Sequence, residues 1–349
     1  MRTPESDEPQ VARSTGSRQP TMADVASEVG VSRQLVSLVL SGKPGASVET
    51  RRRVHDAAER IGYRPHRGAQ LLRQSASHQL GVLFAPAHAT EPDIVEAIYP
   101  AAGAHGYQVL LSATTSTRSG REALEELLSF RSAALIAIGS DLSPSALAAL
   151  ARRASIPLVA VGAGRRNASY DVVRSAGDLG IAACVEHLIA LGHRDIVYVH
   201  VTAMPPAAVR LSGYTRAMAA HDLPTRVLEY DGDYTEESGA QAGRALLDLP
   251  YLPTAVVLGN DQAATGLIIT LARHGVSIPG DVSVTGYDDS RFARLSAVDL
   301  TTARQDPVAL GEGAVSAALR RLADTTASPR EVVVKPELVV RSSTGPPRD

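Results

Sequence analysis

The chain has 349 residues and one cysteine, Cys184, which excludes an intramolecular disulfide and is typical of proteins in a reducing cytoplasm. It contains no run of eighteen or more apolar residues, and residues 1–20 are polar with no hydrophobic secretion region, so we expect neither a secreted nor a membrane-spanning protein. Its 35 basic and 37 acidic side chains are divided unevenly: the net charge is +4 over residues 21–78, which favours a polyanion as partner, and −6 over residues 79–349.

The first predicted element, after a disordered tail over residues 1–20, is a helix that begins at Thr21. Thr21 and Asp24 have the spacing of a helix start, in which each side chain bonds to the backbone of the other residue. Val25, Ala26 and Val29 follow on one face at helical spacing. These residues begin a head domain that we expect to cover residues 21–64.

A glycine turn and a second helix come next. Gly30 supplies the permissive backbone that a tight turn requires, and Ser32 can cap the helix that follows. The buried side of this helix is predicted to consist of Val36, Val39 and Leu40. Arg33, Gln34 and Ser37 are then left facing outward, at the end of the helix where a recognition helix contacts base edges. Arg is suited to guanine and Gln to adenine.

The third predicted helix is basic and completes the head. Ser47 can cap it, Gly62 can end it, and its apolar positions cover the first two helices: Val54, Ala57, Ala58 and Ile61. Four cations can neutralise phosphates: Lys43, Arg51, Arg52 and Arg53. A plain structural bundle is the alternative, since many Ala- and Val-rich helices are joined by a glycine turn. The two caps, the turn and the basic third helix together favour DNA binding.

The head contains a series of short motifs, at residues 21–32, 36–37, 42–44, 49–51 and 62–65. This series resembles the N-terminal signature of the LacI/GalR family of transcriptional regulators, and the resemblance continues to about Thr344. It implies a sequence-specific DNA-binding protein that reads bases with Arg33 and Gln34. The DNA contacts expected in the head are Thr21, Ser32, Arg33, Gln34, Ser37, Leu38, Lys43 and Arg51. The family usually has Arg where this chain has Leu38, so we expect its operator to differ at one base pair.

Residues 65–78 are the predicted link between the head and the rest of the chain. The resemblance implies a hinge helix that folds on DNA and inserts a leucine into the central minor-groove step, and Leu72 has that position, with Ala69 beside it. Arg67 and Arg73 are available for phosphate or minor-groove contacts. Gly68 would weaken a preformed helix, which is consistent with folding on binding. Packing of Leu72 on the core is the alternative.

From residue 79 onward, short apolar strands alternate with helical segments. The predicted strands are residues 80–84, 108–111, 134–138, 158–161, 196–199, 255–258 and 282–285, with 332–334 and 338–341 as returning pieces. Strands separated by helices predict parallel α/β sheets, and the number of strands suggests two of them. The predicted fold class is therefore α/β, with a small all-α helix-turn-helix head.

The resemblance implies that the core, residues 79–344, is two-lobed and periplasmic-binding-protein-like, with a small molecule held between the lobes. We expect lobe 1 to comprise residues 79–190 and 305–334, and lobe 2 residues 191–303 and 335–344. The chain would cross between them near residues 191–192, 303–305 and 334–337. Residues 345–349 are predicted to be a tail.

Polar motifs after the predicted strands mark the expected ligand site. Residues 186–193 resemble the family's crossing helix, 210–214 its effector-facing helix, and 259–262 and 286–289 follow strands. Loops at the carboxyl ends of parallel strands bind ligands in open α/β sheets. The expected effector contacts are Arg210, Asn260, Asp288 and Gln305, whose donors and acceptors suit a sugar or a related polyol. Asp261 and Asp289 are expected to cap a helix or a loop instead.

The first lobe departs from the family beside this site. Residues 88–92 replace the usual Asn-Pro-Phe, and Ala176 and Gly177 replace an Asp-Asn pair, so an aromatic platform and a carboxylate are lost. Aromatic residues make up only 4% of the chain, so few can stack on a sugar. Arg165, Arg166 and Arg174 could bind an anionic effector, although a solvated basic loop is the expected role for all three.

Enzyme and metal-site motifs are weak or absent in the sequence. Residues 162–164 lack the third glycine of a dinucleotide loop, and the spacing of His187 and His193 does not place both rings on one helix face. No catalytic serine elbow or phosphate-binding loop is present. We therefore expect no enzymatic activity, cofactor or metal, but a cytoplasmic homodimer that binds operator DNA and a small-molecule effector. A solute-binding module whose helical head contacts proteins is the alternative.

Overall fold

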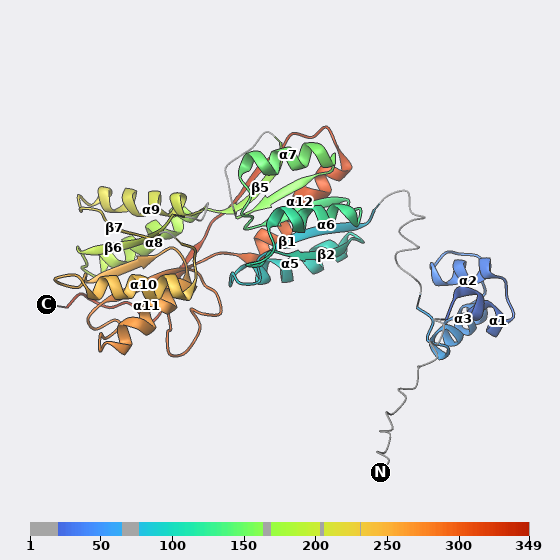
Figure 1. The fold of residues 1–349 in the computed structure, drawn as a ribbon, viewed down its shortest axis with the longest axis horizontal. Coiled ribbons are helices and arrows are strands. Elements are labelled where there is room, and N and C mark those ends of the chain that lie inside the picture. The colour runs from blue at the N-terminus through green and yellow to red at the C-terminus, as the bar shows by residue number, and fades with distance from the viewer. Residues whose placement is uncertain (1–19, 65–76, 163–168, 203–205, 231, 349) are drawn as a thin grey trace, which may run out of the picture. The chain divides into compact units, whose positions relative to one another are not determined.

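The computed structural model describes residues 20–64, 77–162, 169–202, 206–230 and 232–348. The chain divides into two compact units, a head within residues 1–76 and a core over residues 77–349 (Figure 1). Residues 1–19 of the predicted tail over residues 1–20 lie outside the described residues. So do four predicted DNA contacts: Arg67, Ala69, Leu72 and Arg73.

The head is a bundle of three short helices, α1 (Met22–Val29), α2 (Arg33–Leu40) and α3 (Val48–Arg60). The predicted start of α1 is confirmed, because the Thr21 backbone N–H and hydroxyl both donate to Asp24 Oδ2 at 2.7 Å. Gly30 follows with a φ of 71°, a left-handed conformation that favours glycine. The apolar faces of the helices meet in one small core, in which the side chains of Val25, Val36 and Val54 are fully buried.

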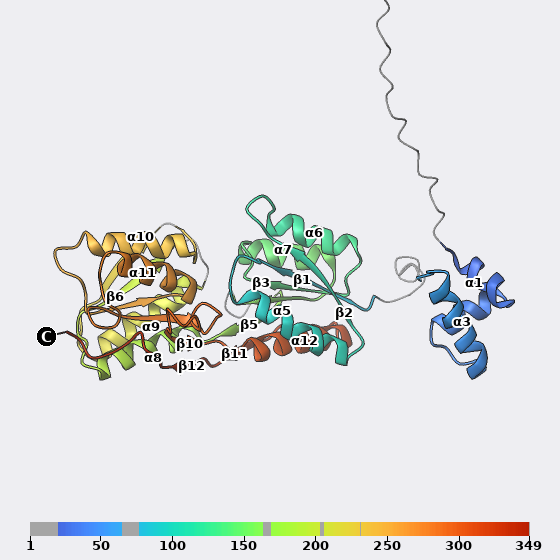
Figure 2. The same cartoon turned by 90° about the horizontal axis from the view of Figure 1, so that it is seen from below.

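Lobe 1 of the core is built on a six-stranded parallel sheet with the order β11-β5-β4-β3-β1-β2. Its strands are β1 (Gln79–Phe84), β2 (Gln108–Ala113), β3 (Ala134–Ile138), β4 (Leu158–Val161), β5 (Asp171–Ser175) and β11 (Glu331–Val334). Helices α5 (Glu91–Ala104) and α12 (Pro307–Ala323) cover one face, and α6 (Gly120–Ser129) and α7 (Pro144–Ala154) cover the other (Figure 2). The central strands are apolar runs because both faces are covered.

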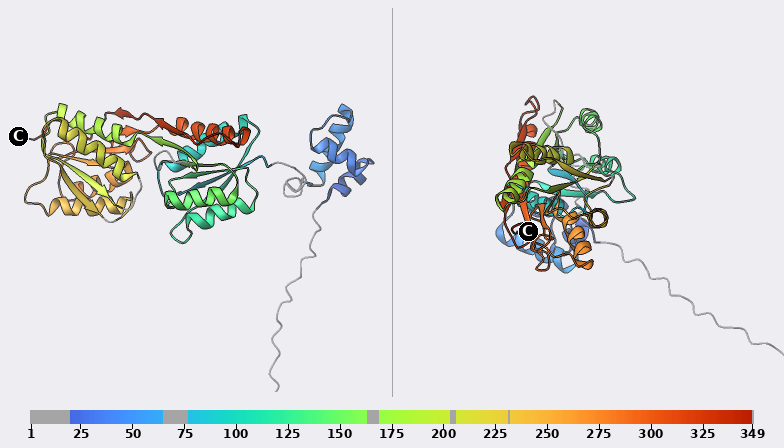
Figure 3. Two further views of the ribbon diagram at one scale, coloured as in Figure 1. Left: turned by 90° about the horizontal axis from the view of Figure 1, so that it is seen from above. Right: turned by 90° about the vertical axis from the view of Figure 1, so that its left-hand side faces the viewer.

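Lobe 2 repeats this design with the strand order β12-β10-β9-β8-β6-β7. Its strands are β6 (Ile196–Val201), β7 (Arg226–Tyr230), β8 (Ala255–Leu258), β9 (Ser283–Asp288), β10 (Thr301–Arg304) and β12 (Glu337–Val339), of which only β12 is antiparallel to its neighbour. Helices α8 (Gly177–Ala190) and α9 (Ala207–Ala220) cover one face, and α10 (Glu236–Leu247) and α11 (Asp261–Arg273) cover the other (Figure 3). The structure therefore has the predicted fold class, with a helical head and two parallel-sheet lobes.

The first crossing between the lobes differs from the prediction. Strand β5 belongs to the lobe 1 sheet, but α8 packs on α9 and on the lobe 2 sheet, where Ile181, Val185 and Leu188 are buried. The chain therefore crosses between Ser175 and Gly177 rather than near residues 191–192, and lobe 1 does not extend to residue 190. The apolar face of α8 is what assigns the helix to lobe 2. The other two crossings lie between β10 and α12 and between β11 and β12.

The residues after β12 are held on lobe 2 and do not form a free tail up to residue 348. The Gly345 carbonyl accepts a hydrogen bond from His193 Nε2 at 2.9 Å, and Arg348 donates to the Asp281 and Leu252 carbonyls at 2.6 Å. These contacts tie the end of the chain to the segments that precede β6, β8 and β9. Among the described helices, none combines the length and the apolar character that crossing a membrane requires.

Candidate functional site

The outward face of α2 carries the residues predicted to read DNA. Arg33 and Gln34 begin the helix and are exposed, and Ser32 Oγ caps it by accepting from the Leu35 N–H at 3.2 Å. Because the cap fixes the first turn, it also fixes the direction in which these two side chains leave the helix. Leu38 is half-buried one turn further along, and its Cδ1 would lie 3.2 Å from a Cβ placed on Gly45. Leu38 therefore packs against the loop that follows α2.

The basic residues of the head divide into two groups. The Arg51 guanidinium donates to the Lys43 carbonyl, and Arg53 donates to the Val29 carbonyl at 2.8 Å, so both hold the loops between helices. The Lys43 side chain is exposed, and that of Arg52 is 82% exposed and lies 3.8 Å from Asp56. Lys43 and Arg52 can therefore contact phosphates. Arg51 and Arg53 instead hold the helices of the bundle in place.

The core contains a cavity between its lobes, at the carboxyl ends of strands from both sheets. Lobe 1 lines it with His88, Glu91 and Ser140. All four predicted effector contacts also line it, Arg210, Asn260 and Asp288 from lobe 2 and Gln305 from a crossing between the lobes. Its atom-free space is about 690 Å³, including the part that is open to solvent. This location is the one in which parallel α/β sheets bind ligands, because the loops there carry the polar side chains.

Arg210 is the buried cation of the cavity. Its Nη1 donates to the Gly259 carbonyl, its Nη2 lies 3.7 Å from Asp288 Oδ1, and its Nε has no hydrogen-bond partner among the described residues. The guanidinium carbon lies 4.0 Å from the centre of the Tyr287 ring and 5.2 Å from that of Tyr234. Although burial lowers the pKa of Arg210, Tyr234 and Asp288 raise it above its ordinary value. The residue therefore stays charged, with N–H capacity left for a ligand.

Asp288 faces Arg210 from the end of β9. Gln305 Nε2 donates to Asp288 Oδ1 at 2.6 Å, and burial raises the pKa of the carboxyl although Arg210 lowers it. The φ of Asp288 is 123°, a strained value for any residue but glycine. Gln305 lies between β10 and α12, on a crossing, so this hydrogen bond links the cavity to the connection between the lobes.

Asn260 lines the cavity but already has two structural partners. Its Oδ1 caps α11 by accepting from the Ala263 N–H at 3.0 Å, and its Nδ2 donates to the Tyr234 carbonyl at 2.9 Å. An amide keeps one N–H and one lone pair beyond these bonds, so a ligand contact remains compatible. Through Asn260 the helix start and the loop of Tyr234 are fixed together beside the cavity.

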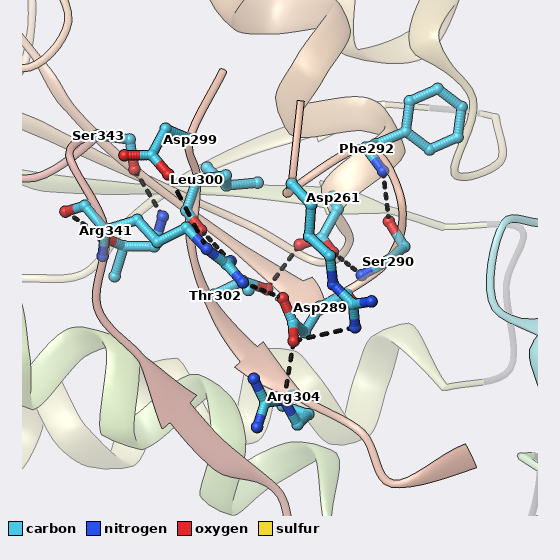
Figure 4. Close-up of polar contacts among 12 residues, drawn as sticks. Asp261, Asp289, Ser290, Phe292, Asp299, Leu300, Thr302, Arg304, Arg341 and Ser343 are labelled. Atoms are coloured by element: carbon cyan, nitrogen blue, oxygen red, sulfur yellow. Dashed lines mark hydrogen bonds and ion pairs between the residues drawn. The ribbon is translucent and has the colours of Figure 1, made fainter. Parts of the chain in front are cut away.

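Asp261 and Asp289 are buried anchors outside the cavity (Figure 4). Asp261 accepts from the Thr302 hydroxyl at 2.5 Å and from the Ser290 N–H at 2.7 Å, and burial raises its pKa well above the ordinary value. Asp289 forms ion pairs with three arginines: Arg294, Arg304 and Arg341. Asp261 therefore caps the loop after β9 and also bonds to β10, whereas Asp289 joins that loop to the neighbouring strands through ion pairs.

A histidine and a glutamate form a buried pair on the lobe 1 side of the cavity. His88 Nδ1 lies 2.7 Å from Glu91 Oε1, and Glu91 Oε2 accepts from the Ala85 N–H at 2.6 Å. The hydrogen bond with Glu91 raises the pKa of His88, and burial raises the pKa of Glu91. A Cβ on Gly139 would lie 2.0 Å from Glu91 Oε1, so glycine at that position is what lets the carboxylate fit.

Other sequence expectations have different outcomes in the structure. Arg174 lies in β5 and pairs with Glu331 of β11 at 2.6 Å, so it does not form a basic loop; Arg165 and Arg166 lie outside the described residues. Tyr234 was missed as a cavity residue, because a single tyrosine in a polar loop has no periodic pattern around it. Among the described residues, no group of His, Cys, Asp and Glu could hold a metal ion.

Comparison with known proteins gives two family matches. Residues 21–66 match the model of bacterial regulatory proteins of the lacI family, and residues 185–344 match the periplasmic-binding-protein-like domain. The chain is also 32% identical over 338 residues to the HTH-type transcriptional repressor PurR of Escherichia coli, covering 94% of this chain and 98% of that protein. The chain belongs to the LacI family, whose members are DNA-binding transcriptional regulators, and not to a family of enzymes.

Two solved structures resemble the whole chain. A Lac repressor dimer bound to operator and the anti-inducer ONPF superposes with a TM-score of 0.80 at 28% identity, over 94% of this chain and 100% of that one. A complex of the transcriptional regulator CelR with cellobiose superposes with a TM-score of 0.68 at 26% identity, over 93% of this chain and 99% of that one. The protein is therefore a LacI-family transcriptional regulator with an effector-binding core.

Proposed function

We propose that this protein is a homodimeric cytoplasmic repressor whose two heads bind the half-sites of a pseudo-palindromic operator. The observation that carries this proposal is the capped, exposed start of α2, where Arg33 and Gln34 can meet base edges. A single head of three short helices offers few contacts, whereas two heads one helical turn apart on DNA bind together. The likeness to an operator-bound Lac repressor dimer supports the paired arrangement.

The effector proposed for the cavity is a sugar or a related uncharged polyol. Asp288 supplies acceptor oxygens, Arg210 supplies free N–H groups, and Tyr234 supplies an aromatic surface, which together suit a ring that carries hydroxyls. The cellobiose complex of CelR, a protein with the same two-lobed core, supports this class of ligand. Bound between the lobes, such a molecule would favour one lobe arrangement and so change operator affinity.

Base reading can be tested with DNA selected from a random pool by the full-length protein. Arg33→Ala and Gln34→Ala should each cost about 1–3 kcal/mol on the selected site and relax base preference, because each removes a base contact. Arg52→Ala is the matched control, since an exposed phosphate contact weakens selected and random DNA alike. Equal losses on both DNAs for Arg33→Ala would contradict the assignment of α2.

The remaining elements of the proposal have their own tests. Deletion of residues 1–74 should abolish operator binding in a mobility-shift assay and leave a folded dimer with twice the mass of the truncated chain. Leu72→Ala should weaken the selected site more than random DNA, since a wedge acts only on a specifically bound duplex. A monomeric protein with no preference for selected DNA would refute the paired mode of binding.

A further inference from the structure

A second cavity adjoins the first, and His88, Gly139 and Ser140 line both. The second cavity has about 1540 Å³ of atom-free space, open solvent included, and lies beyond the carboxyl ends of β1, β2 and β3. Lobe 2 contributes Asp233, from the loop before α10. A ligand that fills the first cavity can therefore continue past His88 into the second without leaving the space between the lobes.

The lining of the second cavity is rich in hydroxyl groups. The loop that follows β2 contributes five of them, from Thr114, Thr115, Ser116, Thr117 and Ser119. The Thr115 and Thr117 hydroxyls lie 3.3 Å apart, and the Ser116 hydroxyl has no hydrogen bond among the described residues. A hydroxyl both donates and accepts, so such a surface matches a ligand that is itself covered with hydroxyls.

The charges of the described residues around the second cavity favour an uncharged ligand over an anion. Among the described residues that line it, Arg118 is the one permanent cation, and Glu126 neutralises it at 2.6 Å; His88 is paired with Glu91, and Glu122 is held by its own helix start. The carboxylates of Asp141 and Asp233 have no ion-pair partner in the described part of the chain. Unpaired carboxylates repel phosphates and acids, and they accept hydrogen bonds from neutral hydroxyls.

His88 stands at the junction of the two cavities with one nitrogen free. Glu91 holds Nδ1, so Nε2 is the ring atom available to a ligand. When His88 is protonated, Nε2 carries an N–H and donates; when His88 is neutral with its proton on Nδ1 toward Glu91, Nε2 has a lone pair and accepts. The junction therefore offers a saccharide one ring nitrogen: as a donor it suits the ring and linkage oxygens, which only accept, and as an acceptor it suits the hydroxyl groups.

We infer that the effector is an uncharged oligosaccharide of at least two sugar units, one in each cavity, with its linkage beside His88. This inference rests on the proposed effector function of the cleft and specifies its ligand. The first unit meets Arg210, Asp288 and Tyr234, and the second meets the hydroxyl loop and Asp233. A monosaccharide would fill the first cavity alone and forgo the contacts of the second.

Calorimetric titration of the full-length protein tests the inference. The probes are maltose, cellobiose, lactose, melibiose, trehalose and maltotriose, with glucose and galactose as their units. We expect at least one oligosaccharide to bind about tenfold or more tightly than its units. If no oligosaccharide of this panel binds, or if a single unit binds as tightly as the larger saccharide, the inference is overturned.

Variants of the second cavity locate the additional unit. Asp233→Asn should reduce the ratio of oligosaccharide to monosaccharide affinity about tenfold, and Ser116→Trp should reduce it by filling the cavity from an exposed loop. Asp222→Asn is the matched control, because Asp222 is exposed on lobe 2 and lines neither cavity. An unchanged ratio in both cavity variants would overturn the inference.

The outcome can be separated from that of the proposed function. Operator affinity is measured in parallel, with and without each saccharide and with glucose 6-phosphate as an anionic probe. If operator selectivity persists and only glucose 6-phosphate changes it, the oligosaccharide assignment fails while the regulatory function stands. If the protein shows no selectivity for operator DNA, the proposed function itself fails.

Discussion

Asp289 is the residue whose replacement gives the sharpest prediction for the core. Its carboxylate is fully buried, and it lies 2.5 Å from Arg341, 2.8 Å from Arg304 and 3.2 Å from Arg294 (Figure 4). Arg304 is the last residue of β10, immediately before a crossing between the lobes, and Arg341 follows β12. One carboxylate thus holds the ends of β10 and β12, the two lobe 2 strands that adjoin crossings. Asp289→Asn removes its charge and keeps its size.

The expected cost follows from the exposure of the three partners. Arg304 and Arg294 are 45% and 62% exposed, so solvent screens these pairs and each contributes about 0–1 kcal/mol. Arg341 is 16% exposed, and breaking a buried pair of this kind costs about 3 kcal/mol. The total is about 3–5 kcal/mol. For a unit the size of the core, at about 2 °C per kcal/mol, this corresponds to a fall in Tm of roughly 6–10 °C.

Urea denaturation followed by circular dichroism measures this cost. Asp299→Asn is the matched control, because Asp299 also lies near Arg341, at 4.0 Å, but is 48% exposed, so its replacement should cost much less than that of Asp289. Burial raises the pKa of Asp289, but the three arginines together hold it below the ordinary value. The stabilisation is therefore present above about pH 4 and is lost as the pH falls through the lowered pKa. Equal costs for the two variants would refute the reasoning.

Three further predictions concern single residues of the core. Because Glu91 raises the pKa of His88, the stability that this pair supplies should decline as the pH rises above about 6.5. His88→Gln should therefore flatten the change in unfolding free energy between about pH 6 and 8. An unchanged slope would count against the pair. In a thermal scan, Gly239→Ala should destabilise the core by at least about 1–3 kcal/mol, since its methyl group would lie 1.8 Å from a backbone oxygen of α11. Gly103→Ala is the control and should be neutral or stabilising, because the space around Gly103 is open. Burial raises the pKa of the Cys184 thiol to about 12, so iodoacetamide should alkylate it only in denaturant, and labelling of the folded protein at pH 8 would contradict its placement.

Features of the head that depend on local chemistry could be predicted from the sequence. Ser32 and Ser47 accept from backbone N–H groups three residues further on, and Thr21 donates to the Asp24 carboxylate, so each interaction lies within a few positions of the chain. The same holds for Gly30, whose left-handed backbone is a requirement of the turn itself. The apolar faces of the three helices follow from spacing alone.

Three strands and the lobe to which α8 belongs could not be predicted, because they depend on contacts with segments that are distant in the sequence. The strands missed in the prediction are β5, β7 and β10, which carry charged or threonine side chains and are ordered by pairing with apolar neighbours. Helix α8 was assigned to the wrong lobe, because its apolar face identifies a core but not which of two similar sheets covers it. Gly180 shows that α8 packs on lobe 2, because a Cβ there would lie 2.5 Å from the Tyr287 ring, but this contact can be seen only in the folded structure.

Part of the candidate effector site could be predicted from the sequence, and part could not. Arg210, Asn260, Asp288 and Gln305 come from separate motifs, and the fold brings all of them to one cavity. The contribution of lobe 1 could not be predicted. Residues 88–92 differ from the family's Asn-Pro-Phe, which shows that an aromatic platform is lost but not which side chains line the cavity instead. The pairing of His88 with Glu91 depends on the close approach of Gly139, a contact between segments about fifty residues apart.

The cavity and the crossings share residues, and this gives a physical basis for control of the lobes by a ligand. Gln305, on one crossing, bonds to Asp288, while Ser175, on another, lies 2.6 Å from the hydroxyl of Tyr287, whose ring packs on Arg210. A ligand that displaces Arg210 or Asp288 therefore acts on two crossings at once. Since a coupling of 1–3 kcal/mol changes affinity roughly 5–150-fold, the loss or gain of one or two of these buried contacts is sufficient for regulation.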